Sequence, residues 1–194
     1  MERIKTIRRK TNETDIEIEL NIDGCGDSEI STPVPFLNHV LSSFARHGCF
    51  NLKVKASGDV DIDPHHLIED IGICLGKAVA ECIGDKKGIN RFGFVIIPMD
   101  ETEVTISLDL GGRPYLRYSV EILNEKIENM STLLIRDFFK ALVDNSSMNL
   151  HINKNVGVNS HHIIEAVFKA FGIALKQAVR KGASTSIPST KGML

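Results

Sequence analysis

An internal repeat constrains the fold of this chain more than any other feature of its sequence. Three blocks of the first half recur in the same order in the second half: residues 3–24 at 91–112, residues 36–54 at 134–152, and residues 65–79 at 161–175. The shift is 88, 98 and 96 positions for the three blocks, so it changes only in the loops between them. Each half is therefore predicted to be one folding unit, and the chain a duplication.

Each half is predicted to fold in the order ββαβα. Alternating apolar residues in 16–22 and 104–110 are typical of half-buried strands, and the preceding segments serve as hairpin partners. The predicted elements are strands 3–10 and 16–22, helix 33–46, strand 50–56 and helix 65–83, then strands 91–98 and 104–110, helix 131–144, strand 148–154 and helix 161–181. This order predicts an α+β fold of two internally duplicated half-domains, with helices packed on sheets.

The predicted units are residues 1–88, residues 89–183 and a C-terminal tail, 184–194, within one compact domain. The tail is polar, and its composition predicts irregular or disordered structure. The tail nevertheless carries Pro188-Ser189-Thr190-Lys191-Gly192, whose hydroxyls and ammonium group suit a phosphate.

Composition excludes several classes of function. The chain has 23 basic and 25 acidic side chains, a net charge of −2, whereas a nucleic-acid partner calls for a basic surplus. No segment has the roughly 20 apolar residues of a membrane helix, and the N-terminus has no apolar core of a secretory signal. The four cysteines form no CxxC pair, which favours reduced thiols and a cytoplasmic location.

Two HHxxE motifs are the strongest chemical signal. His65-His66 precede Glu69, and the second half repeats this pattern at 161–165. At a helix start, the first histidine and the glutamate lie four residues apart on one face, whereas adjacent histidines point about 100° apart. One motif can therefore contribute to two metals, and imidazole with carboxylate suits Mn, Fe, Zn, Co or Ni. A single motif is more simply explained as ordinary histidines at a helix start and a surface glutamate, but two matched copies are not.

Repeat symmetry adds a further pair of candidates, because His39 aligns with Asp137 near the start of the shorter helix. A carboxylate at a helix start also has a purely structural explanation. Together the candidate metal ligands are His39, His65, His66, Glu69, Asp137, His161, His162 and Glu165. Eight side chains suit two metals with four protein ligands each. His47 and His151 are weaker candidates, although His47 could face the site.

Other residues suit phosphate binding or proton transfer. Arg91 begins a strand, and Arg113 lies in a rigid Gly-Gly-Arg-Pro turn that can aim its guanidinium group. Glu13 and Glu101 occupy equivalent places before a strand, and either could be a general base. Each of these residues taken alone is more often a solvated surface charge.

The combination of motifs resembles the imidazoleglycerol-phosphate dehydratase family of histidine biosynthesis. The motifs run almost from end to end: RKTNETDI (9–16), FLNHVLSSFARHG (36–48), DPHHLIEDIGICLGKA (63–78), RFGFVIIPMDETEV (91–104), DLGGRPYL (109–116), HHIIEAVFKAFGIAL (161–175) and PSTKG (188–192). Nothing remains for the phosphatase domain fused to some members, so the chain resembles the single-activity form.

The resemblance implies conversion of an imidazolyl glycerol phosphate to the corresponding ketone phosphate with loss of water. It also implies two Mn²⁺ per site, sites between subunits, and trimers that assemble into a 24-mer. The eight candidate ligands match the family's ligand positions, except that well-known members have His where this chain has Asp137. The substrate contacts implied are Glu13, His47, Arg91, Arg113, Lys169, Ser189 and Lys191, to which the adjacent hydroxyl of Thr190 is added.

The implied chemistry uses the metal as a Lewis acid on the imidazole ring. Imidazolate can expel the neighbouring hydroxyl and give a diazafulvene-like intermediate, after which a carboxylate must remove a carbon-bound proton. Glu13 is the expected base, Glu101 is a weaker alternative, and Glu69 and Glu165 could move protons on the imidazole. A dinuclear metal hydrolase and a non-enzymatic metal-binding assembly protein remain alternatives, which the reaction products would distinguish.

Overall fold

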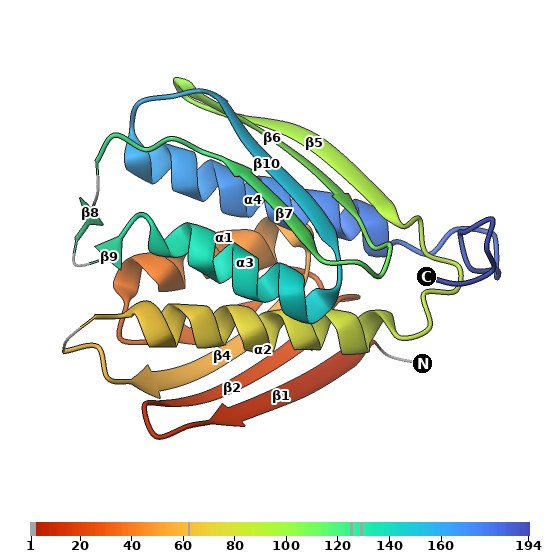
Figure 1. Cartoon of the computed structure of the whole chain (residues 1–194), viewed down its shortest axis with the longest axis horizontal. Coiled ribbons are helices and arrows are strands. Elements are labelled where there is room, and N and C mark those ends of the chain that lie inside the picture. Colours follow the sequence, from red (N-terminus) through yellow and green to blue (C-terminus); the bar gives the residue numbers. More distant parts are fainter. Residues whose placement is uncertain (1–2, 62, 125, 129) are drawn as a thin grey trace.

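The computed structural model describes residues 3–61, 63–124, 126–128 and 130–194. Over these residues the chain forms four helices, which lie between two four-stranded sheets (Figure 1). The first half contains β1 (Ile4–Lys10), β2 (Thr14–Asn21), β3 (Ser28–Ser31), α1 (Pro35–Gly48), β4 (Asn51–Gly58) and α2 (His65–Ile83). The second contains β5 (Phe92–Met99), β6 (Thr102–Asp109), β7 (Tyr115–Ser119), α3 (Leu134–Ser146), β10 (Asn149–Val156) and α4 (Ser160–Val179). A small hairpin, β8 (Lys126–Ile127) and β9 (Met130–Ser131), precedes α3.

The two sheets have the same topology, which confirms the α+β duplication. Their strand orders are β1-β2-β4-β3 and β5-β6-β10-β7, and the last pair in each sheet is parallel while the other pairs are antiparallel. The main sheet of each half thus has one more strand than the predicted ββαβα order, and the second half also has the separate β8–β9 hairpin. β3 and β7 have only four and five residues, and each pairs across a helical crossover with a strand distant in sequence. Local periodicity therefore gives little sign of them.

The inner faces of the sheets follow the predicted alternation. Ile16, Ile18 and Leu20 of β2 are buried while the residues between them face outward, and β6 repeats this pattern. The predicted elements agree with the observed ones apart from shifted ends, most clearly at α3, which begins three residues later than expected. The tail contains no helix or strand over its described residues, 184–194, as its composition predicts.

The two halves interlock through their helices. α2 packs against α3 and α4 packs against α1, so each long helix contacts the short helix of the other half. Glycines permit this close approach: a Cβ on Gly72 would lie 2.5 Å from the carbonyl oxygen of Phe138, and one on Gly172 2.5 Å from that of Phe44. This exchange brings ligand candidates of one half beside those of the other.

Within the described part of the chain, no helix is both long enough and apolar enough to cross a bilayer. The four cysteines, all of them described, form no disulfide.

Candidate active site

The HHxxE motifs lie in the first turns of α2 and α4, which begin at the same end of the molecule (Figure 1). A short polar side chain two residues before each motif accepts hydrogen bonds from backbone N–H groups at the helix start. The Oδ1 of Asn159 accepts hydrogen bonds from the backbone N–H groups of His161, at 2.9 Å, and His162, at 3.4 Å. Asp63 accepts one from the N–H of His65 at 2.9 Å. Sequence reasoning missed both residues, although Asp or Asn just before a helix is a recognised capping signal.

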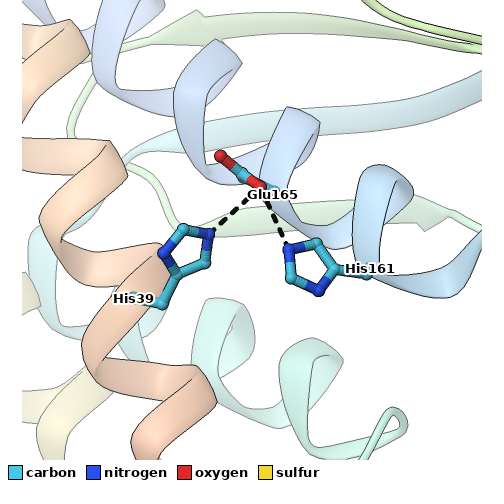
Figure 2. A group of neighbouring side chains, drawn as sticks. All are labelled: His39, His161 and Glu165. Carbon is cyan, nitrogen blue, oxygen red and sulfur yellow. Dashed lines mark hydrogen bonds and ion pairs between the residues drawn. The ribbon is translucent and has the colours of Figure 1, made fainter.

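The Glu165 cluster consists of His39 from α1 with His161 and Glu165 from α4 (Figure 2). The Oε2 of Glu165 lies 3.1 Å from the Nε2 of His39 and 3.2 Å from the Nε2 of His161. The three residues offer ligand atoms that all lie within 4.8 Å of one another. Two imidazole nitrogens converging with a carboxylate oxygen form a donor set that fits a divalent transition metal.

The second oxygen of Glu165 is held separately. Its Oε1 accepts from the ammonium group of Lys169 at 2.9 Å and from the Ser43 hydroxyl at 3.4 Å. Burial of this carboxyl group raises its pKa, but hydrogen bonds from Lys169 and His39 outweigh burial and lower the pKa of Glu165 to about 2. Glu165 is therefore a permanent anion near neutral pH, as a metal-ligating carboxylate must be.

Lys169, an expected substrate contact, thus has an ion-pair partner within the chain. His47, in the last turn of α1, is influenced by the same group, because burial and the charge of Lys169 lower the pKa of His47. A neutral His47 retains a lone pair and can accept or donate a hydrogen bond to a ligand.

The Glu69 cluster consists of His65 and Glu69 from α2 with Asp137 from α3, the equivalents of the Glu165 cluster. His65 approaches Glu69 through Nε2 and Asp137 through Nδ1, both at 3.6 Å. These contacts are longer than those at Glu165. The position equivalent to Lys169 is Ile73, so this cluster carries two carboxylates and lacks that ammonium group. The two clusters therefore differ in charge.

The second histidine of each HH pair contacts a carboxylate at a hairpin tip instead of its own cluster. The Nδ1 of His66 lies 3.3 Å from Glu13 Oε2, and the Nδ1 of His162 lies 2.8 Å from Glu101 Oε2. All eight predicted ligands thus lie at one end of the helices, but they divide into two clusters of three and two outlying histidines. Each HHxxE motif does face two directions, as the helical spacing predicts.

Glu13 and Glu101 are equivalent in sequence but held differently. The Oε1 of Glu101 accepts from the backbone N–H of Asn159 at 3.0 Å and the hydroxyl of Thr102 at 3.1 Å, in addition to the contact of Oε2 with His162. The hydrogen bond from His162 and the backbone N–H of Asn159 lower the pKa of Glu101 to about 2. Glu13 is more than half exposed and has only the longer histidine contact among its described side-chain interactions. Glu13 is therefore the more available base.

The loop that carries Glu13 is anchored from behind by a buried network. The neighbouring Thr14 donates through its hydroxyl to Asp70 Oδ2 at 2.6 Å, and Arg9 donates through Nε to Asp70 Oδ1 at 2.8 Å. Asp70 directly follows Glu69, so the network ties the hairpin to the ligand-bearing helix. Sequence reasoning did not single out Asp70, because an acidic residue in a helix gives no sign of burial.

A cationic pocket of about 390 Å³ lies at the other end of the molecule. It is lined by the five expected phosphate contacts, which are Arg91, Arg113, Ser189, Thr190 and Lys191. The structure thus brings the tail together with the Gly-Gly-Arg-Pro turn. One difference from the sequence expectation is that Arg91 is already paired: its Nε donates to Asp109 at 2.6 Å, and its Nη1 donates to the carbonyl oxygen of Pro188 at 2.9 Å.

The cationic pocket and the two clusters are far apart within one chain. Arg91 hydrogen-bonds through its backbone N–H to Ala178, near the end of α4, whereas His161 lies in the first turn of that helix. At 1.5 Å per residue, these two positions on α4 are separated by about 25 Å. A small substrate cannot span that distance.

Fold and site together define an α+β protein of two duplicated halves, with paired histidine–carboxylate clusters and a separate cationic pocket. The sequence profile described as imidazoleglycerol-phosphate dehydratase matches residues 32–175. The chain therefore belongs to the imidazoleglycerol-phosphate dehydratase family, whose members are enzymes of histidine biosynthesis.

Individual relatives agree with this membership. Proteins named imidazoleglycerol-phosphate dehydratase from Acetivibrio thermocellus and Geobacter sulfurreducens are each 51% identical to this chain, with 100% of both chains covered. A crystal structure of imidazoleglycerol-phosphate dehydratase from Staphylococcus aureus N315 superposes with a TM-score of 0.84 at 40% identity, covering 92% of this chain and 99% of that one. A structure from Pyrococcus furiosus, in complex with (S)-C348, gives 0.85 at 37% identity, covering 97% and 100%.

Proposed function

We propose that this chain converts D-erythro-1-(imidazol-4-yl)glycerol 3-phosphate to 3-(imidazol-4-yl)-2-oxopropyl phosphate and water. Family membership supports the reaction. The observation that carries the assignment of residues is the Glu165 cluster, repeated by symmetry at Glu69, together with the cationic pocket. The clusters suit two metal ions beside an imidazole ring, and the pocket suits a phosphate group.

We propose that the metals are two Mn²⁺ per site, held by the eight predicted ligands. The Glu165 cluster supports this, because its three donor atoms converge and leave positions for further ligands. In the Glu69 cluster, His65 turns different nitrogens toward its two carboxylates, so there the proposal rests on the repeat symmetry. When bound, Mn²⁺ supplies Lewis acidity to the imidazole ring of the substrate and so assists departure of the neighbouring hydroxyl. The carboxylates of Glu69 and Glu165 are also the proposed groups that move protons on the imidazole ring.

Glu13 is the proposed base for the carbon-bound proton. The hydroxyl on the carbon next to the ring leaves, and Glu13 removes the proton from the adjacent carbon, which also carries a hydroxyl. The product of this step is an enol, and protonation of the carbon next to the ring converts it to the ketone. The elements of one water molecule are lost in total, and the phosphate is retained.

The proposed phosphate contacts orient the two reacting carbons relative to that base. Arg91, held by Asp109, presents a fixed guanidinium group, and Arg113, Ser189, Thr190 and Lys191 supply further donors. His47 and Lys169 complete the proposed substrate contacts at the Glu165 cluster, where Lys169 is held by its ion pair.

The separation of about 25 Å along α4 supports a site completed by other copies of the chain. His66 and His162 each lie outside the cluster of their own HHxxE motif, so each is free to complete a metal site built by a neighbouring copy. We therefore include in the proposal the trimer-based 24-mer that the family resemblance implies, with the active sites between subunits.

A product assay tests this function. Purified, Mn²⁺-loaded protein is incubated with the imidazolyl glycerol phosphate, and the ketone phosphate and free phosphate are measured together, with an EDTA-treated control. Metal-dependent ketone without phosphate release is expected. Release of inorganic phosphate would indicate a hydrolase, and no reaction with any divalent metal would indicate a binding protein.

A further inference from the structure

Glu101 lies at the tip of the β5–β6 hairpin, in contact with Asn159 at the start of α4. Its position in the second half is equivalent to that of Glu13 in the first half. Both carboxylate oxygens of Glu101 have hydrogen-bond partners within the chain. Oε1 accepts two hydrogen bonds, from the backbone N–H of Asn159 and the hydroxyl of Thr102, at 3.0 and 3.1 Å. Oε2 lies 2.8 Å from the Nδ1 of His162. The carboxylate is thus fixed by the loop that precedes α4 and turned toward one histidine nitrogen.

This arrangement determines which nitrogen of His162 carries the proton. An ionised carboxylate has only acceptors, so a hydrogen bond at 2.8 Å requires an N–H on Nδ1. In the neutral ring, the lone pair then resides on Nε2. Nε2 approaches Asp100 at 3.8 Å, beyond hydrogen-bonding distance, so that contact does not occupy the lone pair.

We propose that Glu101 is a positioning residue for a metal ligand: it holds His162 in the Nδ1–H tautomer and presents Nε2 to a divalent cation. A carboxylate that accepts from the distal nitrogen of a ligating histidine fixes the ring and increases its basicity. The inference deepens the proposed function, and it rests on that function only in taking His162 as a ligand.

Glu13, the equivalent residue in the first half, is held by fewer and longer contacts than Glu101. Glu13 meets the Nδ1 of His66 at 3.3 Å, and the hydroxyl of Thr14 bonds to Asp70 instead of to the glutamate. Equivalent positions of the duplication have thus taken different roles. Glu101 is committed to its histidine, and Glu13 is left available for the substrate.

The test is Glu101→Gln, measured as Mn²⁺ affinity by electron paramagnetic resonance of free Mn²⁺ during titration of the assembled protein. The amide oxygen can keep both hydrogen bonds at the Oε1 position, which has two donors facing it. The amide nitrogen then replaces Oε2 and donates to Nδ1, so the proton of His162 must move to Nε2 and block the ligand position. We expect the affinity of the affected site to fall about 10- to 100-fold.

Two matched variants separate this mechanism from a loss of structure. Glu103→Gln removes the same charge two residues further along β6 and should leave Mn²⁺ affinity unchanged. Glu101→Ala removes every hydrogen bond of the side chain, but water can then serve either tautomer of His162. The proposal therefore expects a smaller loss of affinity for Ala than for Gln, whereas a structural role for Glu101 expects the reverse.

His162→Asn separates failure of this inference from failure of the proposed function. If this variant loses affinity and Glu101→Gln then adds no further loss in the double variant, both stand. Suppose instead that His162→Asn loses affinity. The role of Glu101 is then overturned if Glu101→Gln binds Mn²⁺ as tightly as the wild type, or if Glu101→Ala binds Mn²⁺ more weakly than Glu101→Gln does. If His162→Asn binds Mn²⁺ normally, the ligand assignment in the proposed function is wrong.

Discussion

Thr14→Val tests how the proposed base is held in place. The side chain is 4% exposed, and its hydroxyl donates to Asp70 Oδ2 at 2.6 Å. Valine has nearly the same shape, so the change removes a hydrogen bond without creating a cavity. It leaves a buried carboxylate oxygen without that donor, which costs about 1–3 kcal/mol.

The expected loss of stability is about 2 kcal/mol, because Arg9 still donates to the other oxygen of Asp70. For a chain of this size that corresponds to a fall in the unfolding midpoint of roughly 4–8 °C. Thermal unfolding is followed by circular dichroism at matched protein and metal concentrations, since binding and assembly also shift the midpoint. Glu13 adjoins Thr14, so turnover at saturating substrate should fall as well.

Thr102→Val is the matched control, at the equivalent position of the second half. Its hydroxyl is also buried, but it donates to the exposed Glu101 of its own hairpin and not to a buried ion pair. The cost should be only about 0.5–1.5 kcal/mol. Thr14→Ser keeps the hydroxyl and should recover most of the lost turnover. Equal stability of Thr14→Val and Thr102→Val, with full turnover in both, would refute the role of Asp70 as an anchor.

Three further predictions concern the ligands and the pocket. Glu13→Gln should lower kcat by about 10²–10⁴-fold and leave Mn²⁺ content unchanged in elemental analysis; unaltered turnover would remove Glu13 from the mechanism. Lys191→Ala, or removal of the last six residues, should raise KM for the phosphorylated substrate, and unchanged steady-state kinetics would exclude the tail from the site. In metal-free protein, Glu165 should contribute stability that is fully present above pH 4.5 and is lost as the pH falls toward about 2, because its folded pKa is lowered. The difference in unfolding free energy between wild type and Glu165→Gln, measured from pH 7 to pH 2, should therefore shrink in that interval; a constant difference would contradict the lowered pKa.

The sequence predicts the repeated core well because the strands and helices of that core follow from residue patterns within short segments. β2 and β6 alternate buried and exposed residues, and the HHxxE spacing specifies a helix face without knowledge of the fold. The candidate ligands come from the same source. Repeat alignment relates His39 to Asp137, and the structure places the two residues in equivalent clusters.

Local patterns cannot predict the partners that the fold supplies. The exchange of helices between halves, which puts His39 beside His161, depends on packing between residues more than 100 positions apart. The same holds for Asp70, whose buried contacts come from another element, and for β3, which pairs only after a crossover. The difference between Glu13 and Glu101 depends on tertiary hydrogen bonds that equivalent sequences do not reveal.

We propose that each active site takes its metal ligands and its phosphate pocket from different copies of the chain. The direct test is activity of mixed assemblies of two defective chains, His161→Asn and a chain lacking its last six residues, co-expressed with different tags and assayed well below KM. In a random equal mixture about one site in four combines two intact parts, so about a quarter of wild-type activity is expected where each parent has almost none. Activity no higher than that of the parents would show that each site lies within one chain.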